Sequence, residues 1–291
     1  MTSTSGAATI RGLLDSGATL NMPGVYDALS ARLAGEAGFE VVFISGYSVS
    51  ASRLGMPDYG YLTQSEIVEA ATTVCANTPR PVIVDADTGY GNPLNAIRTA
   101  RLLHRADAAG LFLEDQEWPK KCGHFAGKRV VERAEWLAKL RAVLDLRDEG
   151  VDLFVVARTD ARAALSLDEA IIRAQAARDL GVDAVFVEAP QSLDELERVA
   201  KEVDDVVRVA NMIEGGRTPL LTLAELHDLG YDLVVTPLSG LLAVTRALRQ
   251  AYGALRDKGT LRDDLGLLVP FGDFGPVVDL DAHRRLEQRY A

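Results

Sequence analysis

The sequence predicts an α/β protein built as a (β/α)8 barrel of the TIM type, in one domain over residues 1–291. Eight short runs of β-branched and apolar residues alternate with longer amphipathic stretches. The runs are continuously apolar, as expected for parallel strands that are covered on both faces. No G-x-G-x-x-G motif follows the first run, which disfavours two dinucleotide-binding halves. We expect the barrel at about residues 19–240 and C-terminal helices with a tail at about 241–291.

The eight runs are the predicted strands. They are Thr19–Met22, Val41–Ser45, Val82–Asp85, Gly110–Glu114, Leu153–Arg158, Ala184–Glu188, Val206–Ala210 and Leu233–Thr236. Between them, the spacing of apolar residues predicts helices that include Tyr26–Ala37, Glu132–Arg147 and Ser166–Leu180. The first of these helices carries Leu29, Leu33 and Ala37 on one apolar face. Gly181 and Gly230 stand where a helix commonly ends on a glycine before the next strand.

The composition and charge narrow the classes of function. Hydrophobic residues make up 48% and charged residues 25% of the chain, which is typical of a folded globular protein. A net charge of −11 disfavours nucleic acid and anionic membranes as partners, because both attract clustered Lys and Arg. No apolar run reaches the roughly 18 residues of a membrane-spanning helix, and the first residues lack the pattern of a secretory signal. We therefore expect a cytoplasmic protein in which Cys75, a core residue, and Cys122 stay free thiols.

Polar side chains gather where the predicted strands end, which in such a barrel is the rim that carries the active site. The clusters are Ser45-Gly46-Tyr47-Ser48, Asp85-Ala86-Asp87, Glu114-Asp115-Gln116, Arg158-Thr159-Asp160, Glu188, and Asn211 with Glu214. Several carboxylates on one rim repel one another, and a divalent cation relieves that repulsion. Oxygen ligands alone favour Mg²⁺, with Mn²⁺ as a substitute, over Zn²⁺. The plainer alternative is that the Asp-x-Asp pair forms a turn or a helix cap.

The loop from Gln116 to Arg129 is long for a connection between a strand and a helix, which is typical of a lid over the catalytic rim. It contains the segment Lys120-Lys121-Cys122-Gly123-His124. A thiol beside two lysines and a histidine has a route to a lowered pKa, which suits a proton donor or a nucleophile. The alternatives are a surface loop with an incidental cysteine and a structural hydrogen-bonding role for His124.

Two arginines are candidates for holding a substrate carboxylate through paired hydrogen bonds. Arg158 ends the fifth predicted strand and is the stronger candidate. Arg217 lies in the loop Glu214-Gly215-Gly216-Arg217, where its alternative role is a solvated loop charge. An anionic substrate is therefore compatible with the negative net charge of the whole chain.

Three motifs together resemble the isocitrate lyase/phosphoenolpyruvate mutase superfamily, over about Pro23 to Arg262. They are Asp85-Ala86-Asp87-Thr88-Gly89-Tyr90-Gly91, Glu114-Asp115-Gln116 and Lys120-Lys121-Cys122-Gly123-His124. The cysteine loop is similar to that of the lyase branch, within which the finer motifs resemble the petal death protein, 2,3-dimethylmalate lyase and 2-methylisocitrate lyase group. One finer motif is Asn211-Met212-Ile213-Glu214-Gly215-Gly216.

The resemblance implies roles for individual side chains. Asp85 would bind Mg²⁺ directly, and Asp87 and Glu114 would bind it mostly through water. The residues expected in catalysis are Cys122, Arg158, Glu114 and His124. The residues expected to bind the substrate are Ser45, Gly46, Tyr47, Asp58, Lys120, Gly123, Glu188, Asn211, Arg217 and Ser239. The resemblance also implies a homotetramer, a dimer of dimers whose C-terminal helices are exchanged between subunits.

The implied activity is a Mg²⁺-dependent carbon–carbon lyase. It would cleave a 2-hydroxy dicarboxylate, of the 2-alkylmalate or methylisocitrate type, into a 2-keto acid such as pyruvate and a carboxylic acid, with Cys122 as the general acid and the general base unassigned. Tyr47 and the Glu214–Arg217 segment depart from the methylisocitrate lyases and disfavour a tricarboxylate substrate. Open alternatives are oxaloacetate hydrolysis or decarboxylation, a phosphonomutase (the carboxyphosphonoenolpyruvate mutase has its own Cys-Gly-His loop), and a non-catalytic binding protein.

Overall fold

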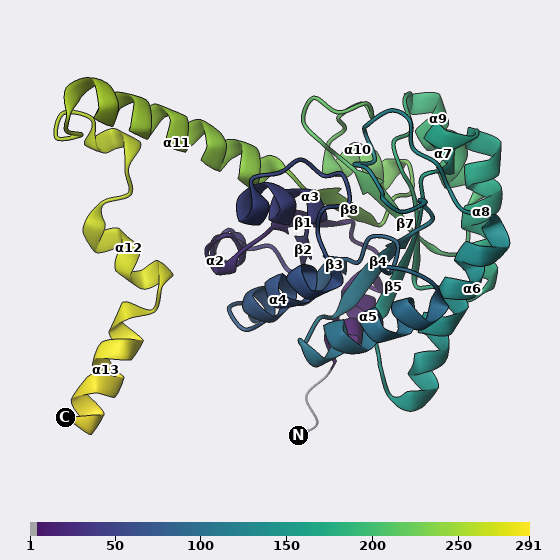
Figure 1. Ribbon diagram of the computed structural model, residues 1–291, viewed down its shortest axis with the longest axis horizontal. Coiled ribbons are helices and arrows are strands. Elements are labelled where there is room, and N and C mark those ends of the chain that lie inside the picture. The colour runs from purple at the N-terminus through teal and green to yellow at the C-terminus, as the bar shows by residue number, and fades with distance from the viewer. Residues whose placement is uncertain (1–4) are drawn as a thin grey trace. The chain divides into compact units, whose positions relative to one another are not determined.

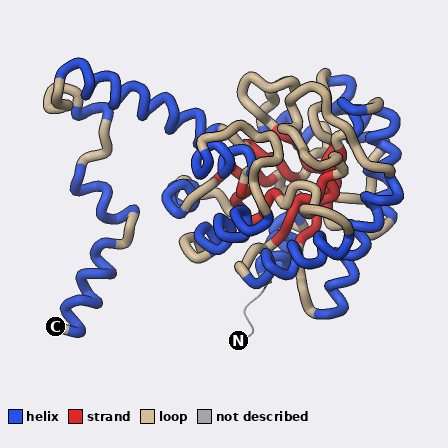
Figure 2. Tube along the Cα trace, viewed as in Figure 1, coloured by secondary structure: helices blue, strands red, loops and turns tan. Residues whose placement is uncertain are grey.

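A computed structural model describes residues 5–291 and contains a closed barrel of eight parallel strands. Each strand pairs with the next in the chain, and β8 pairs with β1 to close the barrel. Helices surround the strands, as Figures 1 and 2 show. The predicted fold class is therefore confirmed.

The strand bounds agree with the predicted runs to within three residues. They are β1 Leu20–Val25, β2 Val42–Ile44, β3 Val82–Asp85, β4 Gly110–Glu114, β5 Phe154–Thr159, β6 Ala184–Val187, β7 Val207–Asn211 and β8 Leu233–Thr236. The α-helices are α1 Gly6–Leu14, α2 Ala28–Glu36, α3 Gly46–Val49, α4 Gln64–Cys75, α5 Pro93–Arg105, α6 Arg133–Leu144, α7 Ala161–Ala164, α8 Leu167–Asp179, α9 Leu193–Glu202, α10 Leu223–Asp228, α11 Ser239–Lys258, α12 Phe271–Val277 and α13 Leu280–Tyr290. Short helical turns of other types lie at η1 Ser50–Leu54, η2 Asp145–Glu149 and η3 Leu265–Leu267.

The barrel wall has a hydrophobic core on each side. Inside the barrel, the ring of Phe112 lies 4.8 Å from that of Phe43 and 5.7 Å from that of Phe186. Outside, alternate strand residues such as Val84 and Leu113 pack in the layer between strands and helices. Because both faces of each strand are buried, the strands appear in the sequence as continuous apolar runs.

Helix α2 packs through a different face from the apolar face that the sequence indicates. Ala31 and Ala34 are buried, whereas Leu29 and Leu33 are 41% and 45% exposed and Ala37 is exposed. The face that carries Leu29, Leu33 and Ala37 is therefore not the face that packs on the barrel. Small alanine side chains let the helix backbone lie close to the strands, and close packing of this kind excludes the larger leucines from the contact.

Two helix ends behave as the sequence predicts. Gly181 follows α8 and Gly230 follows α10, and both have a left-handed backbone, with φ of +86° and +90°. Glycine adopts this conformation without the steric penalty of a side chain. Each glycine therefore ends its helix and turns the chain into the next strand.

Contacts between residues divide the chain into two compact units, one that ends at Ser239 and one that comprises Gly240–Ala291. In the second unit, none of the helices α11, α12 and α13 buries a residue. Both cysteines are free thiols, and the partly buried Cys75 packs against the outer core. In the described part of the chain, no helix combines the length and the apolar character needed to cross a membrane.

Candidate active site

The carboxyl ends of the strands surround one cavity, with about 40 Å³ of space that water can reach. Its polar lining consists of Ser45, Tyr47, Asp58, Asp85, Cys122, Gly123, His124, Arg158, Glu188 and Asn211. Its apolar lining consists of Phe43, Phe112, Phe186, Ile213, Val235, Pro237 and Leu238. Most of the side chains proposed from the sequence therefore meet here, because parallel strands of a barrel all end on the same rim.

Lys120 lies among carboxylates at one side of the cavity. Its Nζ is 2.7 Å from Asp58 Oδ1 and 2.6 Å from Asp87 Oδ1, and all three side chains are buried. Burial disfavours the charged lysine, but Asp87 and Asp58 outweigh that effect and raise the pKa of Lys120 well above its usual value. Behind this group, Gly46 leaves room for Asp85, since an added Cβ would lie 3.1 Å from Asp85 Oδ2.

The site contains more buried acidic than basic residues. The buried acidic residues around it are Asp58, Asp85, Asp87, Glu114, Asp160 and Glu188, and the buried basic residues are Lys120, Lys128 and Arg158. Burial and the nearby Asp85 and Asp58 raise the pKa of Asp87 to about 7, and burial raises that of Glu114 well above its usual value. Within residues 5–291, neither carboxylate oxygen of Glu114 accepts a hydrogen bond.

This donor set fits a hydrated divalent cation. Asp85 borders the cavity, and the two oxygens of Glu114, which accept no hydrogen bond within the described residues, supply further acceptors. Asp87, in contrast, pairs with Lys120 and accepts from Tyr90. No three His, Cys, Asp or Glu side chains of the described residues are grouped as a complete set of metal ligands. Mg²⁺ tolerates this arrangement, because it commonly keeps several waters and binds proteins through only one or two carboxylates.

Arg158 is held by carboxylates at the ends of three strands, β4, β5 and β6. Its Nε lies 3.3 Å from Glu114 Oε2 and 3.0 Å from Asp160 Oδ2, and its Nη2 lies 3.3 Å from Glu188 Oε2. The guanidinium also lies over the ring of Phe186, 5.5 Å from the centroid. A guanidinium held so firmly offers a preorganised positive charge to an anionic ligand.

The loop from Gln116 to Arg129 covers the cavity as a lid. The backbone N–H of Cys122 donates to Asp58 O at 3.1 Å. The side-chain amide of Gln116 donates to Lys121 O at 2.8 Å and accepts from Lys121 N at 3.0 Å. These contacts bury Cys122, which is 8% exposed, against the cavity.

The thiol of Cys122 does not have the lowered pKa that the sequence indicates. Burial, helped by Asp58 and Glu188, raises its pKa to about 12, against a weaker opposing hydrogen bond from the backbone at His124. The expectation fails because Lys120 is paired with Asp58 and Asp87, while Lys121 Nζ donates to Gly127 O. At neutral pH the side chain is therefore a protonated thiol, which suits a proton donor and disfavours a thiolate nucleophile.

His124 and Arg217 hold the outer part of the lid. His124 Nε2 lies 3.1 Å from Glu188 Oε1, and its Nδ1 accepts from Arg217 N at 2.9 Å. Arg217 Nε donates to His124 O at 3.0 Å, and the exposed Arg217 does not line the cavity. The expected clamp of Arg158 with Arg217 is therefore not formed here. Ser239 also lies outside the lining, where its hydroxyl donates to Glu214.

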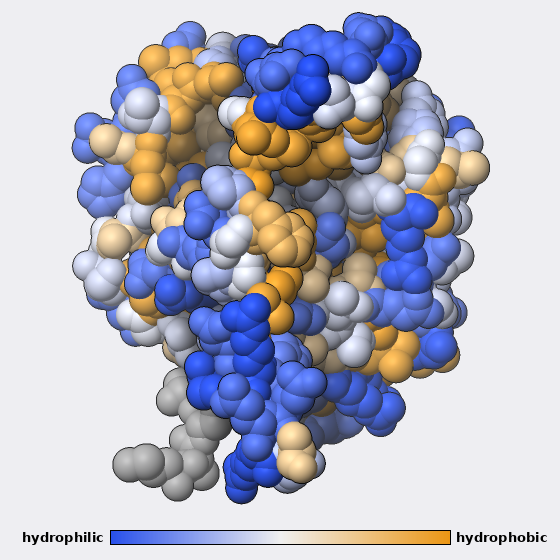
Figure 3. Space-filling view, turned by 90° about the vertical axis from the view of Figure 1, so that its left-hand side faces the viewer, coloured by the Kyte–Doolittle hydropathy of each residue, from blue (hydrophilic) through white to orange (hydrophobic). Residues whose placement is uncertain are grey.

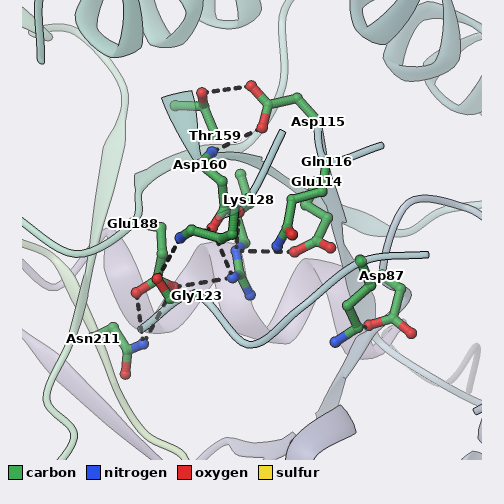
Figure 4. A network of polar contacts seen from close by, with 12 residues as sticks. Asp87, Glu114, Asp115, Gln116, Gly123, Lys128, Thr159, Asp160, Glu188 and Asn211 are labelled. Atoms are coloured by element: carbon green, nitrogen blue, oxygen red, sulfur yellow. Dashed lines mark hydrogen bonds and ion pairs between the residues drawn. The ribbon is translucent and has the colours of Figure 1, made fainter. Parts of the chain in front are cut away.

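Sequence reasoning missed two features of the site. The first is the apolar part of the cavity wall, whose residues are indistinguishable in sequence from ordinary core residues. The second is Lys128, a buried lid residue whose Nζ reaches both Gly123 O and Asp160 (Figure 4). The sequence offered only a weak indication of this contact, namely a lysine in the lid loop and an aspartate, Asp160, directly after a predicted strand.

A closed barrel with a carboxylate-rich rim under a cysteine-bearing lid is the arrangement of a barrel enzyme that acts on a small molecule. The chain belongs to the isocitrate lyase/phosphoenolpyruvate mutase superfamily, since the family model described as phosphoenolpyruvate phosphomutase matches residues 10–256. The resemblance found in the sequence motifs is thereby confirmed, and the protein is an enzyme of this superfamily.

Individual relatives span almost the whole chain. The chain is 49% identical to the chloroplastic carboxyvinyl-carboxyphosphonate phosphorylmutase of Arabidopsis thaliana, and the match covers 93% of this chain and 80% of the relative. The chain is also 45% identical to the petal death protein of Dianthus caryophyllus, and this match covers 99% of this chain and 90% of the relative. Among solved structures, oxaloacetate acetylhydrolase with 3,3-difluorooxalacetate has a TM-score of 0.93 at 33% identity, covering 99% of this chain and 97% of that one. The similar proteins also include 2,3-dimethylmalate lyase and 2-methylisocitrate lyase.

Proposed function

We propose that the protein is a Mg²⁺-dependent carbon–carbon lyase that cleaves a 2-hydroxy dicarboxylate of the 2-alkylmalate class into a 2-keto acid, such as pyruvate, and a carboxylic acid. The observation that carries the proposal is that the thiol of Cys122 lies against a cavity that also presents Arg158 and Asp85. Burial raises the pKa of this thiol to about 12, which keeps it protonated. This set combines an acid, a fixed positive charge and a candidate metal ligand around one small space. A lyase needs these three functions to stabilise and then protonate a carbanion-like product.

Asp85 is the proposed direct ligand of Mg²⁺, with Asp87 and Glu114 acting mostly through water. The excess of buried carboxylates supports a cation here, as does the related structure of phosphonopyruvate hydrolase with oxalate and Mg²⁺ (27% identity, TM-score 0.88). When bound, the ion polarises the 2-hydroxyl and its neighbouring carboxylate as a Lewis acid.

We propose that the keto-acid end of the substrate lies against Ser45, Gly46 and Tyr47. The Ser45 hydroxyl oxygen accepts from Ser48 N at 3.3 Å, which leaves its O–H free to donate toward the cavity. Burial and the nearby Cys122 and Asp58 raise the pKa of Tyr47, so its phenol stays protonated and can donate as well. These donors suit a carboxylate.

The remaining wall supports a small alkyl substituent. Ile213, Pro237 and Leu238 supply apolar surface, whereas Glu188 adds negative charge and holds Asn211 Nδ2 at 3.3 Å. A further substrate carboxylate facing this wall would be desolvated without a matching cation. The wall therefore favours 2-alkylmalates over tricarboxylates.

The proton transfers follow from these positions. A base removes the proton of the 2-hydroxyl, the C2–C3 bond breaks, and its electron pair passes to C3 and the attached carboxylate. Cys122 Sγ then donates its proton to C3. A carboxylate-stabilised carbanion is far more basic than a thiolate, so a thiol with a pKa of about 12 still donates downhill. Arg158 stabilises the negative charge meanwhile, and the lid excludes water.

The test is turnover of a panel of 2-alkylmalates, malate, citrates and oxaloacetate by the purified protein with Mg²⁺. We expect 2-keto acid release from 2-alkylmalates, a loss of about 100-fold or more in Cys122→Ser, and nearly unchanged turnover in the control Cys75→Ser. Oxalate titration should show that Cys122→Ser still binds the product-like ligand. Full turnover in Cys122→Ser would rule out the general-acid role.

Two other reactions have specific support. The relative that is 49% identical is named as a phosphorylmutase, so a phosphonomutase reaction is the second candidate. Phosphorus NMR of carboxyphosphonoenolpyruvate and phosphoenolpyruvate with the enzyme detects a new phosphorus–carbon bond. The likeness to oxaloacetate acetylhydrolase supports oxaloacetate cleavage as a side activity. Oxalate with acetate among the products indicates hydrolysis, and pyruvate indicates decarboxylation.

We also propose that the enzyme is a homotetramer, a dimer of dimers. The support is that helices α11, α12 and α13 bury no side chain of their own, and that hydrophobic residues, in orange, lie on the molecular surface in Figure 3. Phe271 is 97% exposed and Tyr252 is 65% exposed. Large exposed apolar residues of this kind mark subunit contacts. Native mass spectrometry tests this, and a monomer at micromolar concentration would contradict it.

A further inference from the structure

Lys128 is a charged residue buried within the lid. Its side chain is fully buried, and its Nζ donates to the backbone carbonyl of Gly123 and to Asp160 Oδ1, the latter at 2.6 Å. Gly123 directly follows Cys122, so Lys128 holds the lid backbone one residue after the thiol, and Figure 4 shows Lys128 beside Gly123 and Asp160. Burying an ammonium is costly, and its retention in such a position calls for a specific role.

Asp160, the partner of Lys128, is anchored to the rigid barrel. Its backbone N–H donates to Asp115 Oδ1 at 2.8 Å. The other oxygen of Asp115 accepts from Thr159 Oγ1 at 2.6 Å and from Arg173 Nη1 at 3.0 Å. Asp115 directly after β4, Thr159 at the end of β5 and Arg173 of helix α8 therefore hold Asp160 in place through contacts that do not involve the lid.

Asp160 also touches the substrate side of the site. Its Oδ2 accepts from Arg158 Nε at 3.0 Å, while its Oδ1 binds Lys128. The carboxylate of Asp160 therefore binds both Arg158, which is proposed to face the substrate, and Lys128, which holds the lid. Arg158 and Lys128 therefore share Asp160 as an ion-pair partner, which couples the cavity wall to the lid.

We infer that Lys128 is a positioning residue that latches the lid to Asp160 and so sets the Cys122 thiol against the cavity. The inference rests on the proposed function only for the role of Cys122 as the acid. Lys128 itself does not line the cavity and so acts through Gly123 and Asp160.

The first test compares Lys128→Met with a control on the next residue, Arg129→Met. Arg129 is exposed and pairs with Glu117 on the surface, so its replacement removes a lid cation that has no contact with Asp160. The readout is the rate at which iodoacetamide alkylates each thiol, resolved by peptide mass spectrometry. In Lys128→Met we expect Cys122 to react about 10-fold faster or more, because a hydrogen bond to a charged group is lost. We expect an unchanged rate at Cys75, and no change at either thiol in Arg129→Met.

A global loss of stability would raise alkylation at both cysteines together and would lower the thermal midpoint. That result, or an unchanged rate at Cys122, overturns the inference. Lys128→Gln, a polar replacement that a buried position tolerates better, is measured alongside and should change in the same direction. Equal alkylation of Cys122 in Lys128→Gln and the wild type also counts against the latch.

Turnover separates the latch from the proposed reaction. With a 2-alkylmalate we expect kcat to fall about 10-fold or more in Lys128→Met while KM changes less, because the binding groups stay in place. A rise in KM at unchanged kcat contradicts the positioning role. If the proposed reaction is wrong, no malate turns over in any variant, yet the alkylation difference between Lys128→Met and Arg129→Met still tests the latch.

Discussion

Of the two lid glycines, Gly123 has far less free space around it than Gly127, which makes Gly123→Ala a direct test of lid closure. A Cβ built on Gly123 lies 2.5 Å from Cδ of Glu188 and 2.7 Å from Nη2 of Arg158. The backbone of Gly123 is outside the left-handed region, so alanine is strained only by these contacts. Neither neighbour yields easily, because Glu188 is tied to Arg158 at 3.3 Å and to Asn211 at 3.3 Å.

The expected magnitude follows from this overlap. Adding a methyl group to a well-packed site costs about 1–3 kcal/mol, which lowers the ratio of closed to open lid about 5- to 150-fold. The open state has no such clash, so we expect the barrel to keep its thermal stability. Activity on the proposed 2-alkylmalate substrate should fall by a similar factor, because the proposed proton transfer from Cys122 requires a closed lid.

The assay is alkylation of Cys122 beside turnover, with Cys75 as the internal reference. Ala126→Ser is the matched control, since Ala126 is an exposed lid residue where one added atom meets solvent. We expect faster alkylation of Cys122 in Gly123→Ala and no change in Ala126→Ser. Wild-type alkylation and turnover in Gly123→Ala would refute the reasoning that the closed lid is packed this tightly.

Further predictions concern charge and pH. Arg173→Met should destabilise the fold by about 3–5 kcal/mol in urea unfolding, because it leaves Asp115 buried without its cation; a loss below 1 kcal/mol would contradict this. Arg198→Met, which removes an exposed pair with Asp168, should leave the urea midpoint nearly unchanged. Burial raises the pKa of Cys75 and of Cys122 from 9.0 to about 12. In the folded protein both thiols stay protonated up to about pH 12, whereas in the unfolded chain they ionise near pH 9. The two thiols should therefore not change the stability below pH 9, and they should lower it as the pH rises from 9 to 12. Urea midpoints measured across that range should drop less in the Cys75→Ser/Cys122→Ser double variant, and equal drops would count against the raised pKa values.

The barrel and the rim were predictable because both depend on periodic patterns. Strands that are buried on both faces are continuous apolar runs, and residues just after them, such as Asp85 and Glu114, must lie on one rim. Neither inference needs the direction of any individual side chain. The clustering of the strand-end carboxylates follows from topology alone.

The details that escaped prediction depend on direction within loops. Lys120 and Lys121 are neighbours of Cys122 in the chain, but one binds Asp58 and Asp87 and the other binds Gly127 O, so neither lowers the pKa of the thiol. Arg217 similarly turns to His124 O rather than into the cavity. A loop has no period, and the partner of a long charged side chain in it is set by tertiary contacts.

Lys120 gives the acidic rim a counter-ion that belongs to the chain itself. Its ammonium sits between Asp58 and Asp87, beside the proposed metal ligand Asp85. Carboxylates without a counter-ion here would favour folding around a metal, whereas this barrel can fold first and bind the proposed Mg²⁺ afterwards. The supply of metal would then control the activity of the enzyme but not the amount of folded enzyme in the cell. A chelator that stops turnover and leaves the thermal midpoint unchanged is the expected signature, and unfolding on chelation would contradict it.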